Sequence, residues 1–197
     1  MSSSIQVVDN FLPDDIFHPF SLVCMTNQIY VPGDFSGFRS EADGSIDTFG
    51  EHLTPVEEKS FAEVVFQCML YAKSPSHSRV HDIYLCYPLF FKKLEEYLNV
   101  KRWWSMRINC TVGQVKQHIG KYHVDFDKDL LANHDQTTTS ILYLNTNNGG
   151  TKFKETDEFV QSKKNRLVSF PTNTYHAGVW STDAKLRYVL NMTYETK

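Results

Sequence analysis

The second half of the chain is a succession of short apolar segments, and this pattern restricts the fold more than any other feature. From Trp103 onward, segments rich in β-branched and aromatic residues alternate with Gly, Asn, Asp and Pro, which favour turns. The segments are residues 103–112, 114–126, 137–146, 150–155, 165–171, 176–181 and 185–195. Short strands after a helical first half predict an antiparallel sandwich or barrel with helices packed on one face.

The first hundred residues have a different pattern, that of helical support. Thr54, Pro55 and Glu57 form a helix start signal, and the apolar residues that follow recur at helical spacing. We therefore expect a helix over residues 54–73, with one buried apolar stripe.

Two more helices and a long loop complete the expected first half. Helices are predicted across residues 88–99, with Pro88 near the start, and across residues 12–28, where Pro19 disturbs the boundaries. Gly, Asp and Ser dominate about residues 31–53, which we expect to form a long loop.

Composition and charge restrict the class of protein. With 197 residues, 41% of them hydrophobic, we expect a single domain over residues 1–197. A net charge of -3 with scattered basic residues does not favour a nucleic-acid partner. Four widely spaced cysteines indicate reduced thiols, and there is no long apolar run. We expect a soluble, cytoplasmic protein with no membrane partner, and the sequence predicts no oligomeric state.

One short motif offers metal ligands. In an extended segment, His123 and Asp125 point to the same face, so an imidazole and a carboxylate can approach a common point. The pair alone could equally be a solvated strand end. His176, which lies after a turn and before an aromatic strand, adds a third donor. Two histidines and one carboxylate on one side of a metal are the ligand set of non-haem Fe(II) oxygenases.

The last strand predicts an anion site. Alternation places Arg187, Val189 and Asn191 on one face, and an inward arginine in a barrel requires an anionic partner such as a bound dicarboxylate. Tyr143 is positioned for its hydroxyl to reach the same carboxylate. The alternatives are a structural salt bridge for Arg187 and a simple core role for Tyr143.

Six motifs then follow one another in order. They are HVD at 123–125, YLN at 143–145, GGTKF at 149–153, NRLVSF at 165–170, HAG at 176–178 and RYVLN at 187–191. This ordered set resembles the Fe(II)- and 2-oxoglutarate-dependent dioxygenases, in particular the prolyl 4-hydroxylase-like branch. The resemblance covers residues 103–195, and loosely residues 5–15, whereas residues 30–100 match nothing in it.

The resemblance implies a fold and a set of roles. The fold is mainly β, a double-stranded β-helix or jelly roll over residues 101–197, with residues 1–100 as mostly helical support on one face. His123, Asp125 and His176 would be the catalytic Fe(II) ligands. Arg187, assisted by Tyr143, would bind the distal carboxylate of 2-oxoglutarate. Dioxygen would be the second cosubstrate, with ascorbate as a supporting reductant.

The implied reaction is hydroxylation of an unactivated C–H bond, with prolyl residues of a peptide or protein as the first expectation for the substrate. A free amino acid or another small metabolite is the alternative, and residues 126–138 are expected to form a lid over the substrate. The chain departs from the family at Val189, where many members have Ser or Thr. No residue of the 104–122 region can be assigned to the cosubstrate.

Two other classes of protein remain open at this stage. The same three ligands suit Zn²⁺ with one open position, as in a metallohydrolase. A non-catalytic ligand binder on a jelly-roll scaffold is the other alternative.

Overall fold

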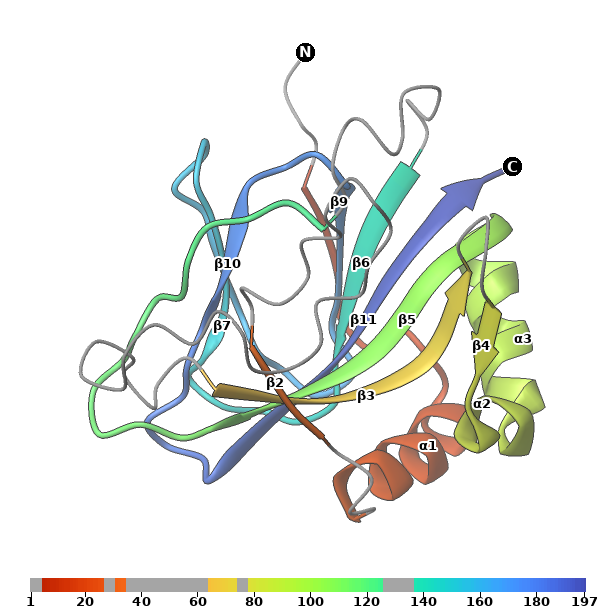
Figure 1. Ribbon diagram of the computed structural model, residues 1–197, viewed down its shortest axis with the longest axis horizontal. Helices are drawn as coiled ribbons and strands as arrows, with labels where there is room; N and C mark the ends of the chain where they lie inside the picture. The colour runs from red at the N-terminus through yellow and green to blue at the C-terminus, as the bar shows by residue number, and fades with distance from the viewer. Residues whose placement is uncertain (1–4, 27–30, 35–63, 74–77, 126–136) are drawn as a thin grey trace.

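The computed structural model describes residues 5–26, 31–34, 64–73, 78–125 and 137–197. Within these residues, two antiparallel sheets face each other, and helices cover the outer side of the larger sheet (Figure 1). The larger sheet has the strand order β1-β9-β6-β11-β5-β3-β2, with β4 paired to β3, and the smaller one has the order β10-β7-β8. This architecture confirms the predicted jelly roll with helices on one face.

The bounds of the elements follow the chain. The helices are α1 (Asp14–Thr26), α2 (Asp82–Cys86) and α3 (Pro88–Tyr97). The strands of the larger sheet are β1 (Gln6–Val8), β2 (Val31–Asp34), β3 (Val64–Lys73), β4 (Ser78–Val80), β5 (Val100–Val112), β6 (Thr137–Tyr143), β9 (Leu167–Pro171) and β11 (Leu186–Thr196). Those of the smaller sheet are β7 (Gly150–Phe153), β8 (Phe159–Gln161) and β10 (His176–Val179).

The larger sheet is covered on both faces. Its outer face packs on α1 and α3 in one apolar cluster, to which Tyr188, Leu190 and Met192 of β11 belong. On its inner face, Arg187 and Val189 of the same strand line a cavity between the two sheets. The alternation predicted for this strand is therefore confirmed, because successive side chains of a strand point to opposite faces.

Two of the three predicted helices are confirmed. The segment 88–99 contains α3, which starts at Pro88, and the segment 12–28 contains α1. Pro19 lies inside α1, so the proline does not end the helix.

The prediction of a helix over residues 54–73 is wrong for the part that the structure describes. Val64–Lys73 forms β3, which pairs with both β5 and β2, whereas residues 54–63 lie outside the described residues. Cys68 and Leu70 pack in the cluster under the helices, while Val65 lines the cavity. A strand with apolar neighbours on both faces loses the polar alternation of a strand, so its pattern imitates a helix.

Several other predicted element boundaries differ from those in the structure. The expected loop at 31–53 begins with the strand β2, and residues 35–53 lie outside the described residues. The described part of the expected strand at 114–126, residues 114–125, forms no regular strand and meets β10 at two isolated bridges, Ile119 with Val179 and His123 with His176. The strand β8 was not predicted. The expected lid at 126–138 lies outside the described residues up to position 136.

Two further expectations concern the whole chain. In the part of the chain that the structure describes, no helix has the length and apolar character needed to cross a membrane. The four cysteines form no disulfide, and Cys86 is the one exposed thiol among them. The single-domain organisation over residues 1–197 stays a prediction.

The segment before His123 is held tightly against β10. The amide of Gly120 donates to the carbonyl of Gly178 at 2.9 Å, and the amide of Trp180 donates to the carbonyl of His118 at 2.9 Å. A Cβ atom at Gly120 would lie 2.7 Å from Cζ3 of Trp180, a side chain that is only 2% exposed. The position of His123 therefore depends on a close contact that glycine alone permits.

We predict that Gly120→Ala destabilises the protein by about 1–3 kcal/mol, because the buried indole must shift to accommodate the methyl group. Urea unfolding followed by circular dichroism measures this loss. Gly178→Ala is the matched control, because a Cβ there meets one atom of Trp180 at an ordinary 3.9 Å. Equal stability of the two variants would contradict the proposed contact.

Candidate active site

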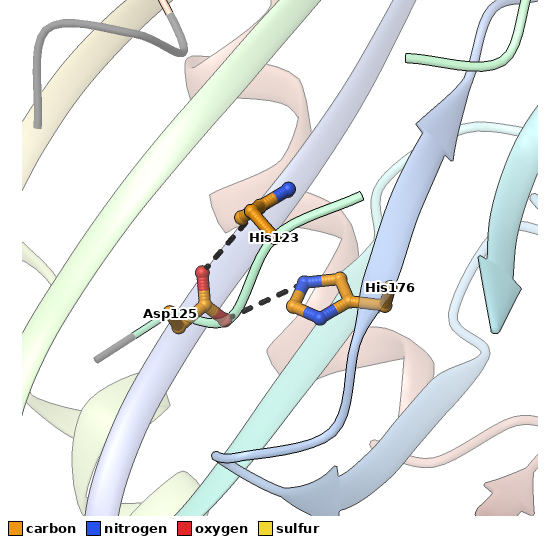
Figure 2. Close-up of side chains that lie close together, drawn as sticks. All are labelled: His123, Asp125 and His176. Atoms are coloured by element: carbon orange, nitrogen blue, oxygen red, sulfur yellow. Dashed lines mark ion pairs between the residues drawn. The ribbon is translucent and has the colours of Figure 1, made fainter. Parts of the chain in front are cut away.

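Three of the predicted site residues converge at one point between the sheets. The imidazoles of His123 and His176 and the carboxylate of Asp125 each offer one donor atom, and these atoms all lie within 4.8 Å of one another. The three side chains point toward one another (Figure 2), and Oδ1 of Asp125 lies 3.9 Å from Nε2 of His123 while Oδ2 lies 3.7 Å from Nε2 of His176. The donor set and its convergence fit a divalent metal ion.

The backbone fixes the orientation of both rings. Nδ1 of His123 lies 3.1 Å from the carbonyl oxygen of Lys121, and Nδ1 of His176 lies 3.0 Å from that of Thr174. A carbonyl oxygen can only accept, so each Nδ1 carries the proton and each Nε2 keeps its lone pair for a metal. The two histidines also pair through their main chains, with amide-to-carbonyl distances of 2.9 and 3.0 Å.

Asp125 is held by two residues of the larger sheet. Nη2 of Arg107 donates to Oδ1 at 3.0 Å, and Nδ2 of Asn191 lies 3.5 Å from Oδ2. Burial alone would raise the pKa of Asp125, but electrostatic interactions with the neighbouring His176 and Arg107 outweigh burial and hold this pKa below its ordinary value. The side chain of Asp125 is only 1% exposed and is ionised, as a metal ligand must be.

The protonation state of His123 fits the same role. Burial, followed by the neighbouring His176, lowers the pKa of His123 below the ordinary value, although Asp125 raises it. A lowered pKa favours the neutral imidazole, which is the form that binds metals.

Arg187 lies on the inner face of β11 as predicted, and it is 5% exposed. Its Nη2 donates to the carbonyl of Gly150 at 2.9 Å, while its Nε has no hydrogen-bond partner among the described residues. Burial lowers the pKa of this guanidinium. Among the described residues, no carboxylate lies within ion-pair distance of it, so the alternative of a structural salt bridge has no support there. A buried cation of this kind is stabilised by an anionic ligand.

Tyr143 lies beside Arg187 but is turned partly away from the cavity. The guanidinium carbon lies 5.6 Å from the centre of the tyrosine ring. The hydroxyl is hydrogen-bonded to Oγ1 of Thr151 at 2.8 Å and to the carbonyl of Val160 at 3.1 Å. The hydroxyl of Tyr143 therefore already has partners within the protein, and its predicted contact with a carboxylate stays a prediction.

A cavity reaches from His123 and His176 to Arg187. The strand β10 contributes His176 and Gly178 to its wall, and Ile141 of β6 is an apolar part of the lining. The paired strands β5 and β11 contribute Asn109, Thr111, Arg187, Val189 and Asn191. The cavity thus has potential metal ligands at one end and, at the other, a cation with no carboxylate partner among the described residues.

Three residues of β5 that face this cavity or its ligands were not predicted, namely Arg107, Asn109 and Thr111. They alternate within one predicted strand, so an inward-facing arginine at position 107 was a readable signal. Which face of that strand is the inner one depends on its pairing with β11, and the sequence alone does not give this register.

The chain is similar to known proteins in structure but not in sequence. No protein-family model matches the chain, and no curated protein matches it in sequence. The chain is similar to the viral collagen prolyl hydroxylase vCPH from Paramecium Bursaria Chlorella virus-1, solved as a 2OG complex, with a TM-score of 0.55 and 12% identity over 100% of this chain and 98% of that one.

Two further solved structures are similar. A prolyl hydroxylase from Trichoplax adhaerens, in complex with a peptide fragment of the hypoxia inducible factor oxygen degradation domain, has a TM-score of 0.54 and 12% identity, covering 98% of this chain and 84% of that one. SnoN, a non-heme alpha ketoglutarate dependent epimerase from nogalamycin biosynthesis, has a TM-score of 0.57 and 11% identity, covering 98% and 78%. At these identities the likeness establishes the fold.

We predict that Arg107→Met weakens binding of Co(II) about 10- to 100-fold, because the carboxylate of Asp125 loses the contact that orients it. Titration with Co(II), followed by its visible absorption, measures the affinity. Arg102→Met is the matched control, because Arg102 lies on the same strand and pairs with Glu195 at 2.7 Å. Affinities for Co(II) within twofold in the two variants would contradict this role of Arg107.

Proposed function

We propose that the chain is an Fe(II)- and 2-oxoglutarate-dependent dioxygenase that hydroxylates an unactivated C–H bond. One observation carries the proposal: two imidazoles and a carboxylate converge beside a cavity, and the same cavity is lined by a guanidinium that has no counter-ion among the described residues. The likeness of the fold to prolyl hydroxylases and to a 2-oxoglutarate-dependent epimerase supports it.

His123, Asp125 and His176 are the proposed Fe(II) ligands. Three protein donors on one side of the ion leave the opposite side for exogenous ligands. Iron bound there would activate dioxygen, of which one atom enters succinate as 2-oxoglutarate loses carbon dioxide and the other enters the substrate. The chain contributes orientation, because both rings and the carboxylate are held by hydrogen bonds before any ligand arrives.

Arg187 is the proposed partner of the distal carboxylate of 2-oxoglutarate. Asn191, which contacts Asp125, lies four residues further along β11, so roughly 13 Å of strand separate the two ends of the cavity. A five-carbon dicarboxylate chelating the metal fits within this span. Val189 and Ile141 line the interval and exclude water, which strengthens the ion pair.

A prolyl residue of a peptide or protein is the proposed substrate. Two of the similar structures are prolyl hydroxylases, and one of them is in complex with a peptide fragment. A small metabolite is the second candidate, because the epimerase SnoN is similar to the chain to the same degree. A zinc metallohydrolase would have no use for the buried Arg187, which counts against this alternative. A non-catalytic ligand binder would release no succinate, so succinate release distinguishes it from the proposed enzyme.

We predict that the protein, reconstituted with Fe(II) and 2-oxoglutarate without oxygen, develops the visible charge-transfer band of the chelate. Asp125→Ala, His123→Ala and His176→Ala should each abolish the band and succinate release, because two ligands rarely retain Fe(II). His18→Ala, an exposed histidine on α1, is the control and should keep both signals. A folded, iron-loaded protein without the band would refute the proposed cosubstrate.

We predict that Arg187→Met raises the 2-oxoglutarate concentration needed for half-maximal band intensity by about 30-fold or more, since truncation of a buried charge partner costs about 2–5 kcal/mol. Arg187→Lys should retain part of the affinity, because lysine keeps the positive charge but cannot form the two parallel hydrogen bonds that a guanidinium gives to a carboxylate. An unchanged requirement in Arg187→Met would count against the assigned role.

A further inference from the structure

The inner face of the β5 and β11 pair is a ladder of three residue pairs. In register, Arg107 lies opposite Asn191, Asn109 opposite Val189, and Thr111 opposite Arg187. The first pair holds the carboxylate of Asp125, so the ladder runs from the proposed metal ligands to the guanidinium. Residues that are directly opposite in an antiparallel ladder have Cβ atoms about 5 Å apart, which places the Thr111 side chain beside that of Arg187.

Two residues of this ladder on β5, Asn109 and Thr111, are buried and polar and have unused hydrogen-bonding capacity. Thr111 is 5% exposed and Asn109 is 6% exposed, and both line the cavity. Within the described residues, Oγ1 of Thr111 and Oδ1 of Asn109 have no hydrogen-bond partner, and neither does Nε of Arg187. Most buried polar atoms in folded proteins have a partner, so this group of three unsatisfied side chains around one cavity indicates a polar ligand.

Neighbouring side chains do not satisfy the hydroxyl of Thr111. Val189, two residues after Arg187 on the same face, is apolar. The hydroxyls of Tyr143 and Thr151 are hydrogen-bonded to each other at 2.8 Å. Thr111 is therefore the hydroxyl at the guanidinium end of the cavity whose donor capacity is unused in the described structure.

We infer that Thr111 is a further binding residue for the cosubstrate, an inference that rests on the proposed function. Its hydroxyl donates a hydrogen bond to the carboxylate oxygen of 2-oxoglutarate that Arg187 also holds. The carboxylate thus receives donors from two adjacent strands, with the guanidinium from β11 and the hydroxyl from β5. A hydrogen bond to a charged acceptor is about twice as strong as a neutral one, so the hydroxyl contributes to affinity.

The test is the affinity of Thr111→Val and Thr111→Ser for 2-oxoglutarate, measured without oxygen by titrating the charge-transfer band of the Fe(II)-loaded protein. We expect Thr111→Val to weaken binding about 10- to 100-fold and Thr111→Ser to stay within about threefold of the original chain. Valine has the shape of threonine and favours strands, and the hydroxyl that it removes has no hydrogen-bond partner among the described residues. The thermal unfolding temperature of Thr111→Val should therefore be unchanged or higher.

A second ligand separates this role from a general disturbance of the cavity. 2-Oxopentanoate has the same chelating end as 2-oxoglutarate and lacks the second carboxylate. Its affinity should be the same for Thr111→Val and for the original chain. Equal losses for the two acids, or no loss for 2-oxoglutarate, would overturn the role of Thr111 while the original chain still binds 2-oxoglutarate. If the original chain develops no band at all, the proposed function itself fails, and the inference fails with it.

Discussion

The antiparallel pairing of β5 with β11 is the constraint on which the site depends. This pairing runs from Leu186 opposite Val112 to Thr196 opposite Val100. A slip of one residue would turn every side chain of a strand to the other face. It would place Arg187 against the apolar cluster under the helices and expose Tyr188 to the cavity. Burying apolar residues such as Leu190 and Met192 on the helix side therefore also selects the inner position of Arg187.

The metal-binding end adds a second constraint, because its ligands come from segments that pair only locally. His123 belongs to no regular strand, and two main-chain hydrogen bonds with His176 determine where it lies. Gly120 and Trp180 pack just before it and keep the segment close to β10. The smaller sheet thus positions the histidines, and the larger sheet positions the carboxylate through the hydrogen bond from Arg107.

The sequence predicted the parts of the fold that depend on local pattern and missed those that depend on register. The inner face of β11 was predicted because its alternation is visible in the chain. The strand β3 was predicted as a helix because both of its faces are buried. Val65 on one face and Cys68 on the other are both apolar, so the sequence shows no polar alternation. Thr111 was missed because its importance comes from lying opposite Arg187, a contact between residues far apart in sequence.

The two ends of the cavity differ in how far the protein satisfies them without a ligand. At the metal-binding end, Arg107 and Asn191 already partner Asp125, so its carboxylate is oriented and compensated before a metal arrives. At the other end, Arg187 and Thr111 each retain a buried polar atom without a partner in the part of the chain that the structure describes. An unsatisfied buried polar group costs about 1–3 kcal/mol, and a charged one costs more. An anion at that end relieves this cost as it binds. The fold therefore preorganises the proposed metal site and leaves the proposed anion site as a source of binding free energy for the ligand that completes it.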